Sequence, residues 1–348
     1  MIRYRGGKGG GVLRKGICVA GNMLVDILYP IESWPSQGEL VHVRDGILRA
    51  TGGAVCNVAV DLAVLDATLP LQAMGKIGED AEGDLILEKL GAYPNIDTSN
   101  VLREGISAHT LVMSNVAAGQ RTFFTYPGAN GRFDEDCVRW ERVSADIFHI
   151  GYILLLNALD QPDEVYGTKL ARLLCHARQH GMKTSIDVVS ETSDRFRQLV
   201  PPALKYADYC VINEYEAQMT TGIALRDASG ALLRENLPEA LRAMRALGVA
   251  EWAVIHCPEG GFGIGPDQAY VQRASLRLPE GYIRGSVGAG DAFCAGVLYG
   301  AERNWTLERA IDLGIACAAA ALSQPGATEG MRPLDGVLKL LEQYDRRE

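Results

Sequence analysis

The sequence predicts an α/β fold, a three-layer α/β/α sandwich whose mostly parallel sheet is accompanied by a small antiparallel β-sheet. From about residue 145 onward, short apolar runs alternate with segments whose apolar residues recur at helical spacing. Such alternation is typical of a doubly wound sheet with helices on both faces. Two earlier blocks, 36–50 and 107–127, are rich in β-branched and aromatic residues and favour a separate sheet.

The first half of the chain is expected to begin with a buried strand at 17–20, which ends in a turn at Gly21 and Asn22. Asp45 and Gly46 form a hairpin signal between two short strand-like runs. The other elements predicted here are a helix at 57–66, a strand at 69–75, and strands at 109–116 and 121–126 joined by a turn at 117–120.

The second half predicts the parallel sheet and its covering helices. Buried strands are expected at 146–151, 183–189, 209–214 and 252–257, and helices at 165–181, 237–249, 288–303, 306–323 and 334–345. No Pro-rich or Ser-rich linker interrupts the pattern. We therefore expect one domain over 17–345, with a lid from 36–50 and 107–127, preceded by a disordered extension over 1–16.

The composition is that of a globular enzyme and excludes several other classes of protein. The chain has 348 residues, 47% of them hydrophobic and 22% charged, and a net charge of −9. With no basic stripe, this charge argues against a nucleic-acid partner, and no apolar run is long enough to cross a membrane. The eight cysteines form no CxxC pair and no secretory signal is apparent, so we expect a cytoplasmic protein with free thiols.

The segment 285–300, GSVGAGDAFCAGVLYG, carries the most chemical information. Gly288, Ala289 and Gly290 precede Asp291 at the start of a predicted helix, where unpaired amides and the helix dipole create an anion site. A carboxylate there repels an anion, but it suits a base that takes a proton from an attacking hydroxyl. The alternative is that Asp291 only caps the helix.

Several polar side chains are predicted to lie near the ends of strands. Asp26 follows the first strand and could accept hydrogen bonds from substrate hydroxyls, or be a turn aspartate. Gly52, Gly53 and Asn57 form a glycine pair that runs into a helix, a pattern that also suits a turn with an Asn N-cap. Asn130 follows a proline and is equally compatible with a substrate contact or a plain turn.

Two further pairs could bind a metal. Asn213 and Glu216 follow a predicted strand and carry the hard oxygen ligands that Mg²⁺ prefers, although they also suit a helix N-terminus. His176 and His180 are four residues apart on a predicted helix. No acidic or cysteine partner is apparent at ligand spacing, so a solvated helix face is favoured for them.

Together these motifs resemble the pfkB (ribokinase-like) family of sugar and nucleoside kinases, and the resemblance spans about residues 17–335. Residues 285–300 resemble the second signature of the family, and residues 51–57 resemble the first. Residues 75–83 match its GkxGxDxxG run, and residues 213–216 match its NxxE motif.

The resemblance implies a ribokinase-like sandwich that uses ATP and Mg²⁺. In that family the residue at Asp291 is the catalytic base, and the amides of Gly288, Ala289 and Gly290 form the anion hole. The sugar would contact Asp26, Gly52, Gly53, Asn57, Asn130 and Asp291. The nucleotide would contact Asn213, Glu216, Gly261, Gly288, Gly290 and Gly326, with Mg²⁺ held by Asn213 and Glu216 through water.

Some residues depart from the family pattern. Ala54 stands where ribokinases carry a lysine, so ribose itself is not implied as the substrate. Pro258 replaces a glycine of the nucleotide loop and cannot donate an amide. Gly285 stands where relatives carry an aspartate that helps hold a monovalent cation, so we expect only weak activation by K⁺.

We expect this protein to phosphorylate a hydroxyl, by analogy with the family a primary one, of a small sugar or sugar derivative. One alternative is a nucleoside kinase, for which Phe123, Phe124 and Tyr126 of the lid would stack on a base. Another is a catalytically silent sugar-binding regulator, against which the intact GAGD motif argues. Relatives often dimerise through the lid, and its apolar strands lead us to expect a homodimer.

Overall fold

The computed structural model describes residues 15–115 and 120–348. Of the extension predicted over 1–16, residues 1–14 lie outside these ranges, and so does most of the turn predicted at 117–120. Residues 15 and 16, which were expected to belong to the extension, are instead packed on the body. The amide of Lys15 donates to the carbonyl of Ser144 at 3.1 Å, and Ile17 donates to Pro70. The ordered chain therefore begins before residue 17.

The main sheet has nine strands in the order β15-β14-β13-β12-β11-β8-β1-β4-β5. Their bounds are β1 Ile17–Gly21, β4 Leu71–Ile77, β5 Ile96–Arg103, β8 Ile147–Ile153, β11 Lys183–Val188, β12 Tyr209–Asn213, β13 Trp252–Cys257, β14 Gly260–Ile264 and β15 Tyr270–Ala274. The strands from β13 to β5 are parallel, as the sequence predicts, whereas β14 and β15 extend one edge in antiparallel fashion.

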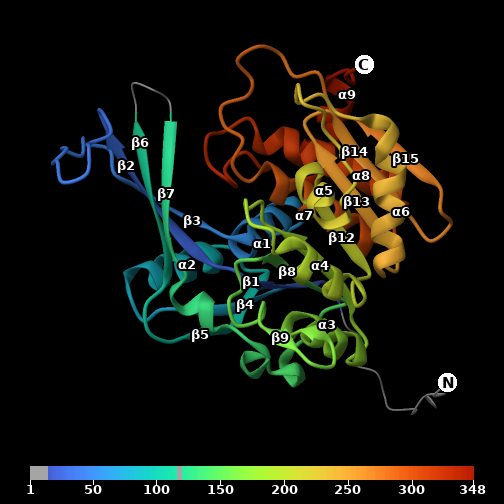
Figure 1. Ribbon diagram of the computed structural model, residues 1–348, viewed down its shortest axis with the longest axis horizontal. Helices are drawn as coiled ribbons and strands as arrows, with labels where there is room; N and C mark the ends of the chain where they lie inside the picture. The colour runs from blue at the N-terminus through green and yellow to red at the C-terminus, as the bar shows by residue number, and fades with distance from the viewer. Residues whose placement is uncertain (1–14, 116–119) are drawn as a thin grey trace.

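Helices cover both faces of this sheet (Figure 1). Their bounds are α1 Ala54–Leu65, α2 Ala81–Gly91, α3 Lys169–Gln179, α4 Phe196–Leu204, α5 Glu214–Thr221, α6 Leu237–Leu247, α7 Ala289–Glu302, α8 Leu307–Ala321 and α9 Leu334–Gln343. Side chains alternate along each strand, so β1 sends Ile17 and Val19 into a core with α1, α7 and α8. Cys18 and Ala20 enter the opposite core, with α3, α4 and α6.

The lid is a separate sheet in the order β3-β2-β6-β7, which projects from the body in Figure 1. Its strands are β2 Leu24–Ile31, β3 Leu48–Gly52, β6 Ala108–Asn115 and β7 Gln120–Tyr126. The hairpin predicted at Asp45 and Gly46 is wrong, because β3 pairs with β2. Strand β2 escaped prediction because only two residues separate it from β1, and the sequence signal there is that of a turn.

Hydrogen bonds fasten the segments that connect the lid to the body. Asn130, in the turn after β7, donates to the carbonyl of Met23 at 2.6 Å and accepts from its amide at 3.2 Å. The amide of Ala129 donates to the carbonyl of Ile106, just before β6, at 2.8 Å. Hydrogen bonds therefore join the segments through which the chain enters and leaves the lid.

The GkxGxDxxG segment carries hydrogen bonds that fix the start of α2. Asp80 caps α2 by accepting from the amide of Gly83 at 2.9 Å, and it also accepts from the amide and hydroxyl of Ser107. These bonds attach the start of α2 to the segment that leads into β6. No helix in the described ranges is long and apolar enough to cross a membrane, and all eight cysteines are free.

Candidate active site

Asp291 lies in the first turn of α7 and is only 5% exposed. It does not cap the helix, so the cap alternative is wrong. The N-cap is Gly288 at φ 76°, and within the described residues no side chain caps α7. A Cβ at Gly288 would collide with the carbonyl of Ala327, so both the positive φ and the close approach require glycine. The first-turn amides of α7 therefore have no side-chain cap among the described residues.

Two side chains from distant elements hold the Asp291 carboxylate. Asn57, from α1, donates its amide to Oδ2 at 2.8 Å. The phenol of Tyr152, at the end of β8, lies 2.9 Å from Oδ2 and 3.1 Å from Oδ1. Asn57 is inside α1, whose N-cap is Gly53, so the predicted Asn N-cap is wrong.

The electrostatics of this site suit a base that works near neutral pH. Burial raises the pKa of Asp291 to about 6, although the hydrogen bonds from Asn57 and Tyr152 oppose this. Burial, with hydrogen bonds from Asn213 and Ser190 in opposition, raises the pKa of Glu216 to about 7. The pKa of Asp187 is also raised by burial and by the charges of Glu216 and Asp291. A cation near these three carboxyls would relieve their repulsion.

The start of α1 forms the wall predicted to contact substrate. Gly53 has a φ of 88°, and the amide of Val55 donates to the carbonyl of Asn22 at 3.1 Å. Among the described residues, the side-chain oxygens of Asn22 and Asn57 are buried without a hydrogen-bond partner. Buried acceptors of this kind require donors, which substrate hydroxyls would supply.

Asp26 and Gly52 lie together where the lid meets this wall. Asp26 is inside β2 rather than in a turn after the first strand, so its predicted setting is wrong. Its pKa is raised by burial, against a hydrogen bond from Thr110. A Cβ at Gly52 would come within 2.9 Å of the Asp26 carboxylate. Asn130 is fully buried on Met23, so its contact with substrate stays a prediction.

Asn213 and Glu216 form a complete capping box at the start of α5. Glu216 accepts from the amide of Asn213 at 2.9 Å and from the hydroxyl of Ser190 at 2.8 Å. No group of three Asp, Glu, His or Cys side chains in the described ranges could ligate one metal ion. Binding of Mg²⁺ by Asn213 and Glu216 through water stays a prediction.

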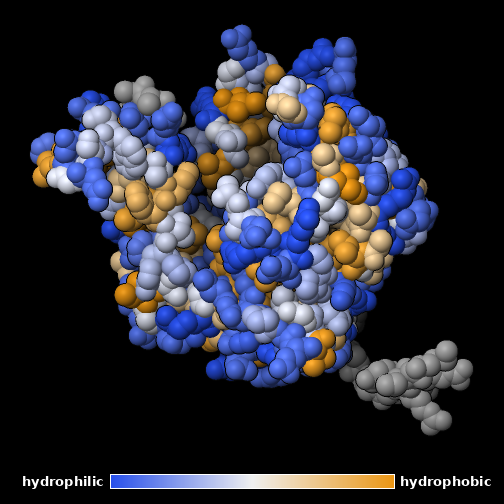
Figure 2. All heavy atoms as spheres, viewed as in Figure 1, coloured by the Kyte–Doolittle hydropathy of each residue, from blue (hydrophilic) through white to orange (hydrophobic). Residues whose placement is uncertain are grey.

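A cavity of about 480 Å³ opens beside the start of α7, in the part of the molecule that faces the lid. It lies between the β13–β14 hairpin, α7 and α8. Among the predicted nucleotide residues it includes Asn213 and Gly290 but not Glu216 or Gly288, and Ala289 of the predicted anion hole also lines it. Figure 2 shows the surface hollowed between the lid and the C-terminal half, with apolar residues along the hollow. Gly261 and Gly326 do not line the cavity. A Cβ at Gly261 would lie 2.6 Å from Ile311, so this glycine serves packing.

The remaining predicted features have structural explanations. His176 is paired with Glu135, and His180 stacks on Trp140 at 5.1 Å between ring centroids. The two histidines therefore have separate contacts, one with Glu135 and the other with Trp140. A Cβ at Gly285 would lie 2.8 Å from the backbone of Pro325, so the aspartate of relatives has no room there.

Sequence analysis missed Asn22, Tyr152 and His256. His256 lines the cavity, packs its ring 4.9 Å from that of Phe293, and stays neutral because burial lowers its pKa to about 4. Tyr152 carries one usable signal, since it directly follows Gly151 near the carboxyl end of a buried strand. Nothing in the local sequence distinguishes Asn22 from an ordinary turn residue.

Comparison with known proteins gives both a family and a relative. A family model described as pfkB family carbohydrate kinase matches residues 14–333. The ribokinase of Arabidopsis thaliana is 24% identical over 334 residues, which cover 94% of this chain and 81% of that protein.

Solved structures share the fold. Arabidopsis thaliana ribokinase complexed with ribose and ATP has a TM-score of 0.76 at 23% identity, covering 94% of this chain and 99% of that one. A provisionally named E. coli ribokinase II in complex with ATP and Mg²⁺ has a TM-score of 0.72 at 16% identity, covering 94% and 99%. The nucleoside kinase of Methanocaldococcus jannaschii has a TM-score of 0.70 at 16% identity, covering 96% and 100%. These likenesses confirm the predicted ribokinase-like sandwich.

Proposed function

Because this chain belongs to the pfkB family of carbohydrate kinases, we propose that it transfers the γ-phosphoryl group of ATP to a primary hydroxyl of a small sugar. The observation that carries the proposal is Asp291, a buried carboxylate in the uncapped first turn of α7. A base beside free amides is what phosphoryl transfer to a hydroxyl needs.

Asp291 would take the proton of the attacking hydroxyl as the new O–P bond forms. With a pKa of about 6, the carboxylate is largely ionised at neutral pH yet still basic enough to accept this proton. The amides of Gly288, Ala289 and Gly290 would stabilise negative charge on the transferring group. The amide of Ala289 has only a 3.4 Å contact, to the carbonyl of Ser286, so it has capacity for such a charge.

Asn213 and Glu216 would hold Mg²⁺ through water at the mouth of the cavity. The ion would supply positive charge to the phosphate oxygens of ATP. Glu216 is fixed by Ser190 and by the backbone of Asn213, so its position does not depend on the ion. The α5 capping box would thus serve both the helix and the nucleotide.

The substrate class follows from the acceptors that face the start of α1. Asn22 and Asn57 each offer a buried oxygen with no partner in the described ranges, and Asp26 adds a carboxylate. A polyhydroxylated molecule supplies several donors at once, which supports a sugar. The fold is equally compatible with a nucleoside, because a nucleoside kinase shares it. Phe123 and Phe124 are more than half exposed on β7 and could contact a base.

An ATP-consumption assay separates these possibilities. The protein is incubated with ATP, Mg²⁺ and a panel of pentoses, hexoses and nucleosides, and ADP release is followed. Turnover with a sugar supports the proposal, and turnover with nucleosides alone favours the same-fold alternative. No turnover above the Asp291→Asn variant with any acceptor would favour a silent binding protein.

We also propose that the lid is a dimer interface. It exposes large apolar side chains, among them Leu40, Val43, Ile47 and Phe124. Sheets of this kind usually pair with another copy of the chain. Val43→Asp should therefore halve the mass measured by light scattering at micromolar concentration. Val165→Asp, at an exposed valine outside the lid, is the control. A single-chain mass of the unmodified protein would contradict the dimer.

A further inference from the structure

Tyr152 is the side chain outside the recognised motifs that touches the proposed base. Its hydroxyl lies 2.9 Å from Oδ2 of Asp291 and 3.1 Å from Oδ1. Burial and the charges of Asp291 and Asp187 hold the pKa of Tyr152 well above its usual range. The phenol therefore stays protonated and acts as a donor to the carboxylate.

The backbone that presents Tyr152 is in an unusual conformation. Tyr152 has a φ of 63° and Leu154 a φ of 86°, in a region that residues with side chains rarely adopt. Such conformations persist where the surroundings impose them, and they are common at functional sites. Two left-handed residues so close together indicate that this segment is built to place one side chain.

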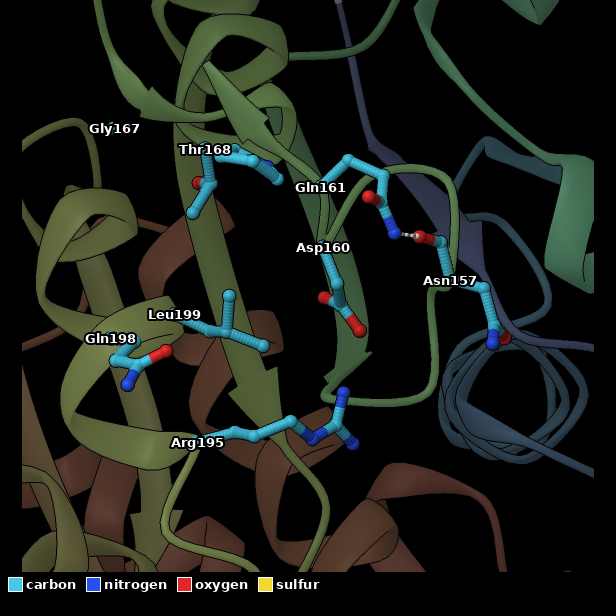
Figure 3. A pocket seen from close by; sticks show the side chains of 9 residues that line it. Asn157, Asp160, Gln161, Gly167, Thr168, Arg195, Gln198 and Leu199 are labelled. Carbon is cyan, nitrogen blue, oxygen red and sulfur yellow. Dashed lines mark hydrogen bonds between the residues drawn. The ribbon is translucent and has the colours of Figure 1, made fainter. Parts of the chain in front are cut away.

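Asp160 and Arg195 impose this conformation from the neighbouring loop. Arg195 donates to the carbonyl of Leu154 at 2.9 Å, and Asp160 accepts from the amides of Leu154 at 3.4 Å and Leu156 at 3.2 Å. Figure 3 shows both charged side chains directed into one cavity, which has a volume of about 340 Å³. Tyr152 itself is tied to this loop, because its carbonyl accepts from the amide of Leu155 at 3.0 Å.

The two oxygens of Asp291 are engaged unequally. Oδ2 accepts from Asn57 at 2.8 Å and from Tyr152 at 2.9 Å, so both of its lone pairs are used. Oδ1 has only the longer 3.1 Å contact with Tyr152. An oxygen with a free lone pair can accept a proton from a third group.

The geometry points to Tyr152 as a positioning residue that, together with Asn57, fixes Oδ2 of Asp291 and leaves Oδ1 to take the substrate proton. This inference rests on the proposed role of Asp291 as base. The proton moves from the substrate hydroxyl to Oδ1 while the hydroxyl oxygen bonds to the γ-phosphorus of ATP and the bond between that phosphorus and the leaving ADP oxygen breaks. Tyr152 keeps its own proton throughout.

The pH dependence of catalysis tests this role. The titratable groups whose pKa the charge of Asp291 raises, on the elements packed around it, are Asp61, Asp187, Glu216, Tyr152 and Cys294. Among them Tyr152 is the one that donates a hydrogen bond to the carboxylate. Removing its hydroxyl destabilises the ionised form, which raises the pKa of Asp291 and moves the acid limb of kcat/KM to higher pH.

The experiment compares Tyr152→Phe with the unmodified enzyme from pH 5 to 9, using the sugar that the acceptor panel identifies. We expect the acid limb of kcat/KM to move up by about one pH unit, with kcat reduced more than KM is changed. Tyr299→Phe is the matched control, because Tyr299 also donates to an aspartate, Asp66, at 3.0 Å but lies outside the site. Its pH profile should equal that of the unmodified enzyme.

The outcomes separate this inference from the proposed function. If Asp291→Asn is inactive while Tyr152→Phe keeps the unmodified profile, the role of Tyr152 is wrong and the base assignment stands. If Asp291→Asn remains active, the base assignment fails, and the role of Tyr152 fails with it. If Tyr152→Phe does not fold, 3-fluorotyrosine at position 152 keeps the ring and makes the hydroxyl a stronger donor. The acid limb should then move to lower pH, and an unmoved limb would overturn the inference.

Discussion

Helices α5 and α7 both begin at the cavity of about 480 Å³, but their first turns are built differently. Asn213 and Glu216 close the first turn of α5 with a reciprocal capping box. The first turn of α7 begins at Gly288 and has no side-chain cap in the described ranges. One helix satisfies its amides internally, whereas the other leaves them to a ligand. From this contrast we expect anion binding at α7, with α5 contributing charge and position.

Among the variants that test this difference between α5 and α7, the largest effect is expected at Asp291. Asp291→Asn should lower kcat by about 10²–10⁴-fold, the usual contribution of a positioned general base. Because asparagine has nearly the same shape, ATP binding by calorimetry and thermal unfolding should change little. Turnover within tenfold of the unmodified enzyme would show that α7 carries no base.

Gly288→Ala tests whether the uncapped turn itself matters. The new Cβ would collide with the carbonyl of Ala327 at a φ of 76°, which should displace the first-turn amides and lower kcat at least tenfold. Gly222, at the end of α5, has a φ of 77° and is the matched control away from the cavity.

Gly222→Ala introduces similar strain without touching the anion site. Both glycine variants should lose stability in thermal unfolding, and only Gly288→Ala should also lose kcat. If the two variants lose the same proportion of activity, backbone strain alone explains the effect and the amides of α7 have no special role.

The smallest effect is expected at Glu216, which belongs to the complete capping box at the start of α5. Glu216→Gln keeps an oxygen for the amide of Asn213, so the helix stays capped. The loss of charge should raise the Mg²⁺ concentration that gives half-maximal rate, several-fold by our estimate for a hard-cation site. An Mg²⁺ titration identical to that of the unmodified enzyme would mean that the box only caps α5.

The sequence predicted the central strands of the main sheet and most of its helices, but not β5, β14 and β15 at the sheet edges, nor α2 and α4. Alternating apolar strands and helices predicted the parallel sheet, and the GAGD segment predicted the start of α7, because these signals are local. Strand β2 could not be predicted, since its pairing with β3 and β6 depends on contacts remote in sequence. Tyr152 was missed for the same reason, because its partner Asp291 is 139 residues away.

The sequence therefore predicted the residue types of the candidate site better than it predicted their contacts. Asn57 was expected to face the sugar, yet its amide holds Asp291, and only its oxygen remains for a ligand. Asn213 and Glu216 were compatible with a cap or a metal site, and the cap is confirmed. A residue type limits what a side chain can do, but the packing of distant elements decides which of its atoms are free.

The hydrogen bonds that join the lid to the body have a mechanical consequence. Met23 and Asn130 join the entry to β2 with the exit from β7, and Ala129 and Ile106 join that exit with the entry to β6. The carbonyl of Asn22 also accepts from Val55, directly after β3. These hydrogen bonds link the connecting segments of the lid to one another. If the lid opens, we expect its sheet to rotate as one plate about them, so that release of product and entry of substrate share one motion.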